Sequence, residues 1–142
     1  MTFNTAISND KTKKMNPNKN TKGIAIKMLI AEDNVESTFY LSLIVKPYAQ
    51  EVITVKTGLD AIEACIKNPD INLVLMDIQM PDIDGYEATR QIRKFNKEVV
   101  IIAQTAFAFN GDKIKALAAG CNDYISKPFR KVDMIELIEK YF

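Results

Sequence analysis

The sequence predicts a single α/β domain in which helices cover both faces of a five-stranded parallel sheet, a three-layer (βα)5 sandwich. Three observations lead to this prediction. Short apolar segments alternate with amphipathic segments of helical periodicity along residues 26–142. The segments LVLM and VVII are apolar at every position, which is typical of parallel strands buried on both faces. A length of 142 residues is sufficient for one sizeable core.

The expected strands and helices alternate from Ile26 onward. Strands are predicted at 26–31, 51–56, 71–77, 98–104 and 123–126. Helices are predicted at 35–47, 58–68, 85–95, 111–119 and 131–141. For five such units the flavodoxin-like strand order 2-1-3-4-5 is expected, with a ligand site at the carboxyl ends of the strands.

Local signals indicate where the helices begin and end. Thr57 and Asp60 have the spacing of a capping box at the start of the second helix. Asn110 precedes the fourth helix as a suitable N-cap, and Gly120 follows its last turn. Pro47 is expected to end the first helix, because proline has no backbone N–H to continue it.

The beginning of the chain differs in composition from the rest. Residues 1–25 are polar and rich in asparagine, so they are predicted to form a disordered linker or tail outside a domain of residues 26–142. Residues 1–27 carry a net charge of +5 and the remainder −4, and a basic arm can bind nucleic acid. No aromatic residue is interleaved with these lysines for base stacking, so a solvated linker without nucleic-acid contact is preferred.

Composition also excludes several functions. The absence of histidine excludes histidine metal sites, Ser–His triads and a phosphohistidine carrier. Cys65 and Cys121 belong to no motif, which suits a reducing compartment. No apolar segment approaches the ~18 residues of a membrane span, and the N-terminus lacks the pattern of a signal peptide. A cytoplasmic protein without membrane contact is therefore expected.

Polar side chains occur where four of the predicted strands end. They are Glu32 and Asp33 after the first strand, Asp77 ending the third, Thr105 after the fourth and Lys127 after the fifth. These strands are neighbours in the expected order, so the side chains should share one pocket. Three close carboxylates repel one another unless a cation or a proton lies between them. Each residue alone also fits a helix cap, a strand end or a surface position. Together they predict a site for Mg²⁺, or alternatively Mn²⁺, and a phosphoryl group.

The expected chemistry is transfer of a phosphoryl group to a carboxylate. Asp77 is the natural nucleophile, because carboxylates form covalent aspartyl phosphates. Lys127 would neutralise charge on the phosphoryl oxygens, and the Thr105 hydroxyl would donate a hydrogen bond to one of them. Asp33 is predicted to bind the metal directly and Glu32 through a water molecule, and the metal site also includes Asp77 and the backbone carbonyl of Gln79.

Four motifs together resemble the receiver domains of response regulators, over roughly residues 26–142. They are LIAEDN (29–34), LVLMDIQMPDIDGYEATRQIR (73–93), QTA (104–106) and SKPF (126–129). The resemblance implies a two-component phosphorelay in which Asp77 accepts a phosphoryl group from phosphohistidine and later loses it by transfer or hydrolysis. Such a domain catalyses its own phosphorylation and dephosphorylation without being an enzyme in the usual sense. Its partner would be a histidine kinase core or a histidine-phosphotransfer protein.

The resemblance also implies a conformational switch. Tyr124 is the expected switch aromatic beside Thr105, and a half-buried strand tyrosine is the alternative interpretation. Phosphorylation would change the face made by the fourth and fifth predicted helices and the fifth strand. The residues expected to meet a partner are Lys113, Lys115, Tyr124 and Lys131 on that face. Phe107 and Phe109 are expected contacts near the first helix, and the alternative is that one of them packs under the 105–110 loop.

The resemblance is strongest to the C-terminal receiver of hybrid histidine kinases. The chain would then be a piece of a larger kinase, as the cytoplasmic part of a membrane-bound sensor, and a single-domain regulator is the alternative. A monomer or weak dimer is expected. The Lys127–Pro128 peptide is expected to be cis. The acidic pair is Glu32–Asp33 where Asp–Asp is commoner, so Glu32 reaches one methylene further.

Three other interpretations fit the sequence less well. A haloacid-dehalogenase-like enzyme would need its second carboxylate close to the strand, but Asp82 and Asp84 lie in the loop beyond it, and this loop lacks the full ligand set of an EF-hand. A flavin carrier would need a hydroxyl- and glycine-rich loop where the sequence has Glu-Asp-Asn, which would repel a phosphate. A receiver without phosphoryl chemistry would lack Asp77 or Lys127, and both are present.

Overall fold

The protein forms one parallel sheet between two layers of helices. The structure is a computed structural model that describes residues 25–106 and 110–142. The sheet has the order β2-β1-β3-β4-β5, and each neighbouring pair is parallel. This confirms the predicted fold class and strand order. The strands are β1 (Ile26–Ala31), β2 (Ala49–Val55), β3 (Leu73–Asp77), β4 (Val100–Thr105) and β5 (Asp123–Ser126).

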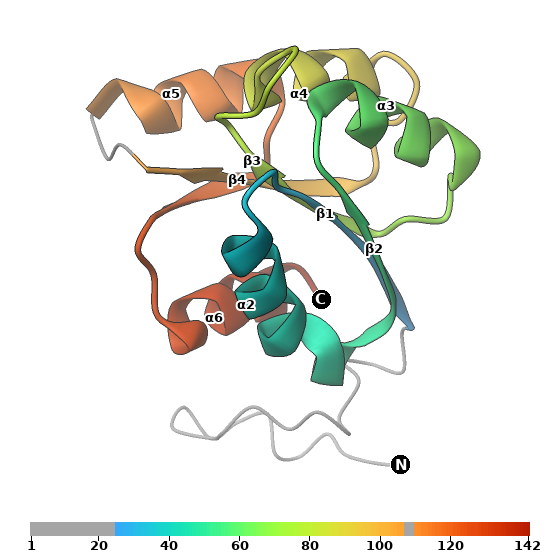
Figure 1. The fold of residues 1–142 in the computed structure, drawn as a ribbon. Coiled ribbons are helices and arrows are strands. Elements are labelled where there is room, and N and C mark those ends of the chain that lie inside the picture. The colour runs from blue at the N-terminus through green and yellow to red at the C-terminus, as the bar shows by residue number, and fades with distance from the viewer. Residues whose placement is uncertain (1–24, 107–109) are drawn as a thin grey trace.

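Helices connect the strands and cover both faces of the sheet. Figure 1 shows one pair, α2 and α6, on one face, with α3, α4 and α5 on the other. A short 3-10 helix, η3, follows α2. The bounds are α2 (Val35–Val45), η3 (Lys46–Tyr48), α3 (Gly58–Lys67), α4 (Gly85–Arg93), α5 (Asn110–Ala119) and α6 (Lys131–Tyr141).

The sheet divides the core into two apolar layers. All five residues of β3 are buried, as expected for a central strand covered on both faces. Leu73 and Leu75 pack with α2 and α6, whereas Val74 and Met76 pack with α3, α4 and α5. Because side chains alternate along a strand, Asp77 continues the series of Leu73 and Leu75 and lies on the α2 and α6 side.

Most helix boundaries agree with the predicted signals. The Thr57 hydroxyl accepts a hydrogen bond from the Asp60 N–H at 3.0 Å and caps α3. Gly120 follows α5 with a φ of 114°, a left-handed conformation that favours glycine. The predicted N-cap Asn110 is instead the first residue of α5. The first helix ends at Val45, two residues earlier than expected, because the chain continues as the 3-10 turn η3 ahead of β2.

Three strands differ from their predicted bounds. β2 begins at Ala49, two residues early, because Ala49 pairs with Ile26 at the start of β1. β3 begins at Leu73, two residues late. β4 begins at Val100, also two residues late, and ends at Thr105, one residue late. Within the described part of the chain no helix is long and apolar enough to cross a membrane. The predictions for the first 24 residues and for Phe107 and Phe109 concern residues outside that part.

Candidate functional site

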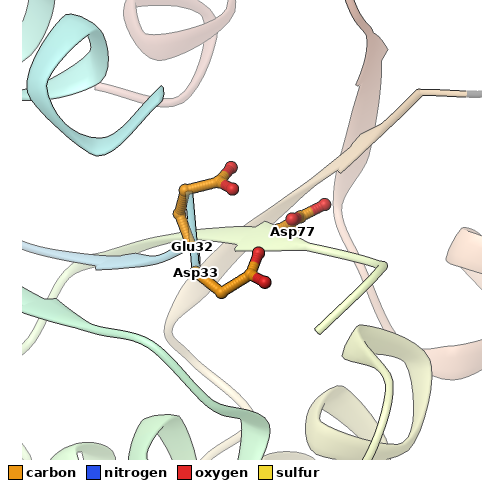
Figure 2. Close-up of side chains that lie close together, drawn as sticks. All are labelled: Glu32, Asp33 and Asp77. Carbon is orange, nitrogen blue, oxygen red and sulfur yellow. The ribbon is translucent and has the colours of Figure 1, made fainter. Parts of the chain in front are cut away.

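Three carboxylates meet at the carboxyl edge of the sheet, and we call them the acidic triad: Glu32, Asp33 and Asp77. Glu32 and Asp33 directly follow β1, and Asp77 ends the adjacent strand β3. Figure 2 shows the three side chains converging. One oxygen from each lies within 4.8 Å of the others. Glu32 and Asp77 are buried, with 1% and 5% exposure, whereas Asp33 is exposed.

Lys127 supplies the positive charge beside the triad. Its Nζ lies 2.8 Å from Glu32 Oε1 and 3.7 Å from Asp77 Oδ1. The second Glu32 oxygen accepts a hydrogen bond from the Asn34 N–H at 3.1 Å. The Lys127 N–H donates to the Thr105 carbonyl at 2.7 Å, which ties the lysine to the end of β4. The Lys127–Pro128 peptide is cis, as expected from the resemblance.

Asp77 lies in an environment that disfavours its charged form. Burial raises the pKa of Asp77 to about 6, and the neighbouring Glu32 carboxylate acts in the same direction. The Lys127 ammonium and the Gln79 N–H, which donates to Asp77 Oδ1 at 3.2 Å, lower the pKa and only partly offset these effects. The carboxylate would therefore gain from a bound cation.

The triad fits a hard divalent cation. Its donors are all oxygen atoms, which Mg²⁺ and Mn²⁺ prefer to softer ligands. Asp33 is the exposed member, and both oxygens of Glu32 already accept hydrogen bonds from protein groups. The arrangement thus offers three carboxylates for a cation, with the Lys127 ammonium directly beside two of them.

The two predicted switch residues lie on neighbouring strands. Thr105 ends β4 and is buried, and it pairs in register with Ser126 of β5. Tyr124, two residues before Ser126, is half-buried and packs against the core layer of α3, α4 and α5. Ala103, two residues before Thr105, belongs to the same layer, so strand alternation places Thr105 and Tyr124 on one side of the sheet.

The loop after β3 is held by contacts that the sequence did not predict. Residues 78–84 connect β3 to α4, and Asp82 adopts a positive φ of 69° there. Its carboxylate accepts hydrogen bonds from the N–H groups of Gly58 and Leu59, at 3.1 and 3.0 Å, at the start of α3. At the other end of the loop, a Cβ on Gly85 would overlap the Asp77 carbonyl oxygen. The loop is thereby fixed against both α3 and Asp77.

Gln104, directly before Thr105, is a residue to which the sequence analysis assigned no role. It pairs in register with Asp77 and is fully buried. In the sequence it is part of the QTA motif and the polar end of the otherwise apolar segment VVIIAQ.

Comparison with known proteins assigns the family. The profile of the response regulator receiver domain matches residues 28–139. Hybrid signal transduction histidine kinase G of Dictyostelium discoideum is 40% identical over 121 residues, covering 82% of this chain but only 4% of the kinase. The polar-differentiation response regulator DivK of Brucella ovis is 34% identical, covering 80% of this chain and 94% of DivK.

Solved structures agree with this assignment. One similar structure is the co-crystal structure of the Saccharomyces cerevisiae histidine phosphotransfer protein Ypd1 with the receiver domain of the response regulator Ssk1. The matching chain is 33% identical, with a TM-score of 0.76, and the match covers 82% of this chain and 88% of that one. The receiver of a Pseudomonas aeruginosa sensor histidine kinase, solved with magnesium in its active-site cleft, is 31% identical with a TM-score of 0.73, covering 83% and 98%. Because its fold and its family profile both match, this chain belongs to the response-regulator receiver domains of two-component signalling.

Proposed function

We propose that this receiver accepts a phosphoryl group from phosphohistidine onto Asp77, with Mg²⁺ as its cofactor. The observation that carries the proposal is the position of Asp77, a buried carboxylate between two acidic neighbours and the Lys127 ammonium. A carboxylate with a pKa of about 6 is ionised at neutral pH and remains a competent nucleophile.

The proposed transfer exchanges one bond to phosphorus for another. An oxygen of Asp77 attacks phosphorus while the P–N bond to the donor histidine breaks, and the imidazole nitrogen keeps the electron pair and takes up a proton. In the later hydrolysis, water attacks phosphorus and the P–O bond to Asp77 breaks, leaving carboxylate and inorganic phosphate. Transfer to a histidine of a partner is the alternative outcome. Lys127 faces the charge on the transferred oxygens, and the Thr105 hydroxyl donates to one of them.

The acidic triad and the Gln79 carbonyl are proposed to hold Mg²⁺, with Mn²⁺ as an alternative. When bound, the ion supplies positive charge to the phosphoryl oxygens. Asp33 is suited to direct binding because it is exposed, and Glu32 to an indirect role because Lys127 and Asn34 already donate to it. The magnesium-bound receiver from Pseudomonas aeruginosa supports this assignment.

The proposed partner is a histidine-phosphotransfer protein or a kinase core, docking on α2. Val35, Phe39 and Leu43 are 68%, 65% and 53% exposed, and their spacing of four residues places them along one side of the helix. A similar receiver domain, that of Ssk1, has been crystallised with the histidine phosphotransfer protein Ypd1, which supports a partner of this class. Phe39→Asp should slow transfer from a phosphorylated partner and leave labelling by a small phosphodonor unchanged. Equal loss of both reactions would show that Phe39 is needed for the folded structure and not for contact with the partner.

Phosphorylation is proposed to change the face formed by α5, β5 and α6. The Thr105 hydroxyl would move toward the phosphoryl group, and Tyr124, on the same side of the sheet, would follow into the space that it leaves. Lys113, Lys115 and Lys131 are exposed on these helices and are proposed to contact the next protein.

We further propose that residues 1–25 are a linker to the rest of a larger cytoplasmic protein. The chain covers 4% of one relative and 94% of another, so both hybrid and single-domain relatives exist. Deletion of residues 1–25 should leave the melting temperature and the phosphorylation rate unchanged, and a fall of several degrees would place the domain boundary earlier.

The central proposal is tested by mass spectrometry after incubation with Mg²⁺ and acetyl phosphate. The wild-type protein should gain one phosphoryl group, and Asp77→Asn should gain none. Asp70→Asn is the matched control, because Asp70 is an exposed carboxylate that pairs with Lys27 at the start of β1. Full labelling of Asp77→Asn would show that another residue is the acceptor.

A further inference from the structure

Gln104 is a buried amide to which the described residues offer no hydrogen bond. Its side chain is 0% exposed, and neither Oε1 nor Nε2 has a partner among the described residues. Buried amides are nearly always paired, because an amide removed from water without a new partner loses free energy. Such an amide points either to bound water or to a ligand.

The Gln104 side chain lies beside a cleft. Ile102, two residues earlier on β4, packs with α2 and α6, so strand alternation places Gln104 on the same side. There the structure has a cleft of about 680 Å³ between α2, the end of β4 and the β5–α6 loop. This volume is within the range of small-molecule sites. The cleft is lined by Ser37, Tyr40, Leu41, Gln104, Ala106, Lys127, Pro128 and Phe129.

The walls of the cleft suit a flat, uncharged molecule. Tyr40 and Phe129 present two rings whose centroids are 6.0 Å apart, and Leu41 and Pro128 add apolar surface. Among the described lining residues Lys127 is the charged one, and its ammonium pairs with Glu32 at 2.8 Å. Because the Lys127 charge is already balanced by Glu32, the cleft is better suited to a neutral ligand than to an anion.

We propose that this cleft binds a small, neutral, planar molecule with an amide or lactam edge, which pairs with the Gln104 amide. One N–H and one carbonyl of the ligand would meet the Oε1 and Nε2 of Gln104 reciprocally. Gln104 lines the cleft but is 0% exposed, so its side chain must turn toward the ligand, and gaining two hydrogen bonds favours this. Lys127 borders both the cleft and the acidic triad, so an occupied cleft would restrict the lysine beside Asp77.

Benzamide is a suitable probe, because it carries one ring and one amide edge. We expect titration of the ¹⁵N-labelled full chain to shift the Gln104 side-chain NH₂ signals and the backbone amides of Ser37 and Leu41. The expected dissociation constant is on the order of 1 mM for a ligand of this size. Acetophenone keeps the ring and the carbonyl but lacks the N–H donor, and it should bind roughly five- to tenfold more weakly.

Three variants separate the cleft from the phosphoryl site. Gln104→Met keeps the shape of the side chain without the amide, and it should reduce benzamide affinity to that of acetophenone. Ala106→Leu should obstruct the cleft and weaken both probes. Asp77→Asn should bind benzamide as the wild type does. The test of the cleft therefore does not depend on whether Asp77 is the phosphoryl acceptor.

Each other outcome overturns the proposal. If no probe binds and Gln104→Met raises the melting temperature, the cleft is dry and the amide is simply unpaired. If no probe binds and Gln104→Met lowers the melting temperature, the amide holds ordered water only. If benzoate binds more tightly than benzamide and Lys127→Met abolishes this, the site is an anion site and not an amide site.

Discussion

Asp77 combines a chemical role with a cost to folding. The proposed nucleophile is buried beside Glu32, and both conditions disfavour its charge in the metal-free protein. Lys127 offsets only part of this effect. A site prepared for a cation and a phosphoryl group is therefore electrostatically strained without them, and this strain should be measurable as a dependence of stability on pH.

The first prediction concerns stability in the absence of metal. The folded-state pKa of Asp77 is raised from 3.8 to about 6, so its contribution to stability is complete below about pH 4 and is lost as the pH rises through 6. A shift of this size corresponds to about 3 kcal/mol as an upper estimate. In EDTA at pH 8, Asp77→Asn should raise the free energy of unfolding by up to that amount, measured with urea.

The same comparison at pH 4 provides the internal control. Asp77 is then protonated in the folded state and resembles asparagine, so the two proteins should have nearly equal stability. The exposed control Asp70→Asn should show no comparable gain at pH 8. A stability difference between Asp77→Asn and the wild type that stays constant from pH 4 to pH 8 would show that burial does not perturb Asp77.

The members of the acidic triad should contribute unequally to metal binding. Asp33→Ala removes the exposed carboxylate and should weaken Mg²⁺ binding by roughly tenfold or more, whereas Glu32→Ala should weaken it by only a few-fold. Glu32 differs because Lys127 and Asn34 already donate to its two oxygens. Isothermal titration calorimetry would measure both, with Glu36→Ala in the first turn of α2 as control. Equal affinity in all four proteins would place the metal elsewhere.

At the scale of elements, the loop 78–84 determines where Asp77 lies. Asp82 caps the start of α3 from this loop, and Gly85 begins α4 in contact with the Asp77 backbone. The acceptor strand, its loop and two helices are thus held as one unit. A change at Gly85 should consequently affect both folding and phosphorylation, although its position bears no functional group.

The third prediction compares two glycines that begin or nearly begin helices. Gly85→Ala should lower the free energy of unfolding by about 2 kcal/mol, because the new Cβ overlaps the Asp77 carbonyl oxygen. Gly111→Ala in α5 is the control, since a Cβ there meets nothing within 4 Å and alanine favours helix by up to about 1 kcal/mol. Urea unfolding and acetyl phosphate labelling would measure both. Equal stability of the two variants would contradict the close packing at Gly85.

Elements and site residues differ in how far the sequence predicts them. Apolar segments and caps such as Thr57 are local signals, so the helices and strands were predicted to within about two residues of their bounds. The expected strand order was enough to predict that Glu32, Asp77 and Lys127 lie close together, although none of their contacts was known from the sequence. The capping of α3 by Asp82 and the unpaired amide of Gln104 depend on neighbours distant in sequence, and no local pattern carries that information.

At the scale of the whole molecule, the sheet separates two apolar layers of the core. Asp77 and Gln104 lie on the α2 and α6 side, whereas Thr105 and Tyr124 lie on the side of α3, α4 and α5. The proposed phosphoryl group on Asp77 would therefore act at the edge of the sheet, where both layers meet. We expect a change to reach the opposite layer through Thr105 at the end of β4.

The last prediction is that phosphorylation shifts an existing equilibrium of the α5, β5 and α6 face. A phosphoryl group adds close to two negative charges at neutral pH, which would draw the Thr105 hydroxyl toward it and let Tyr124 turn inward. Amide spectra with Mg²⁺, before and after addition of beryllofluoride, should therefore show shifts along residues 110–131 as well as near Asp77. Thr105→Val, which keeps the shape but lacks the hydroxyl, should retain the shifts near Asp77 and lose most of those around Tyr124. Shifts confined to the neighbours of Asp77 in the wild type would instead describe a phosphoryl carrier without a conformational response.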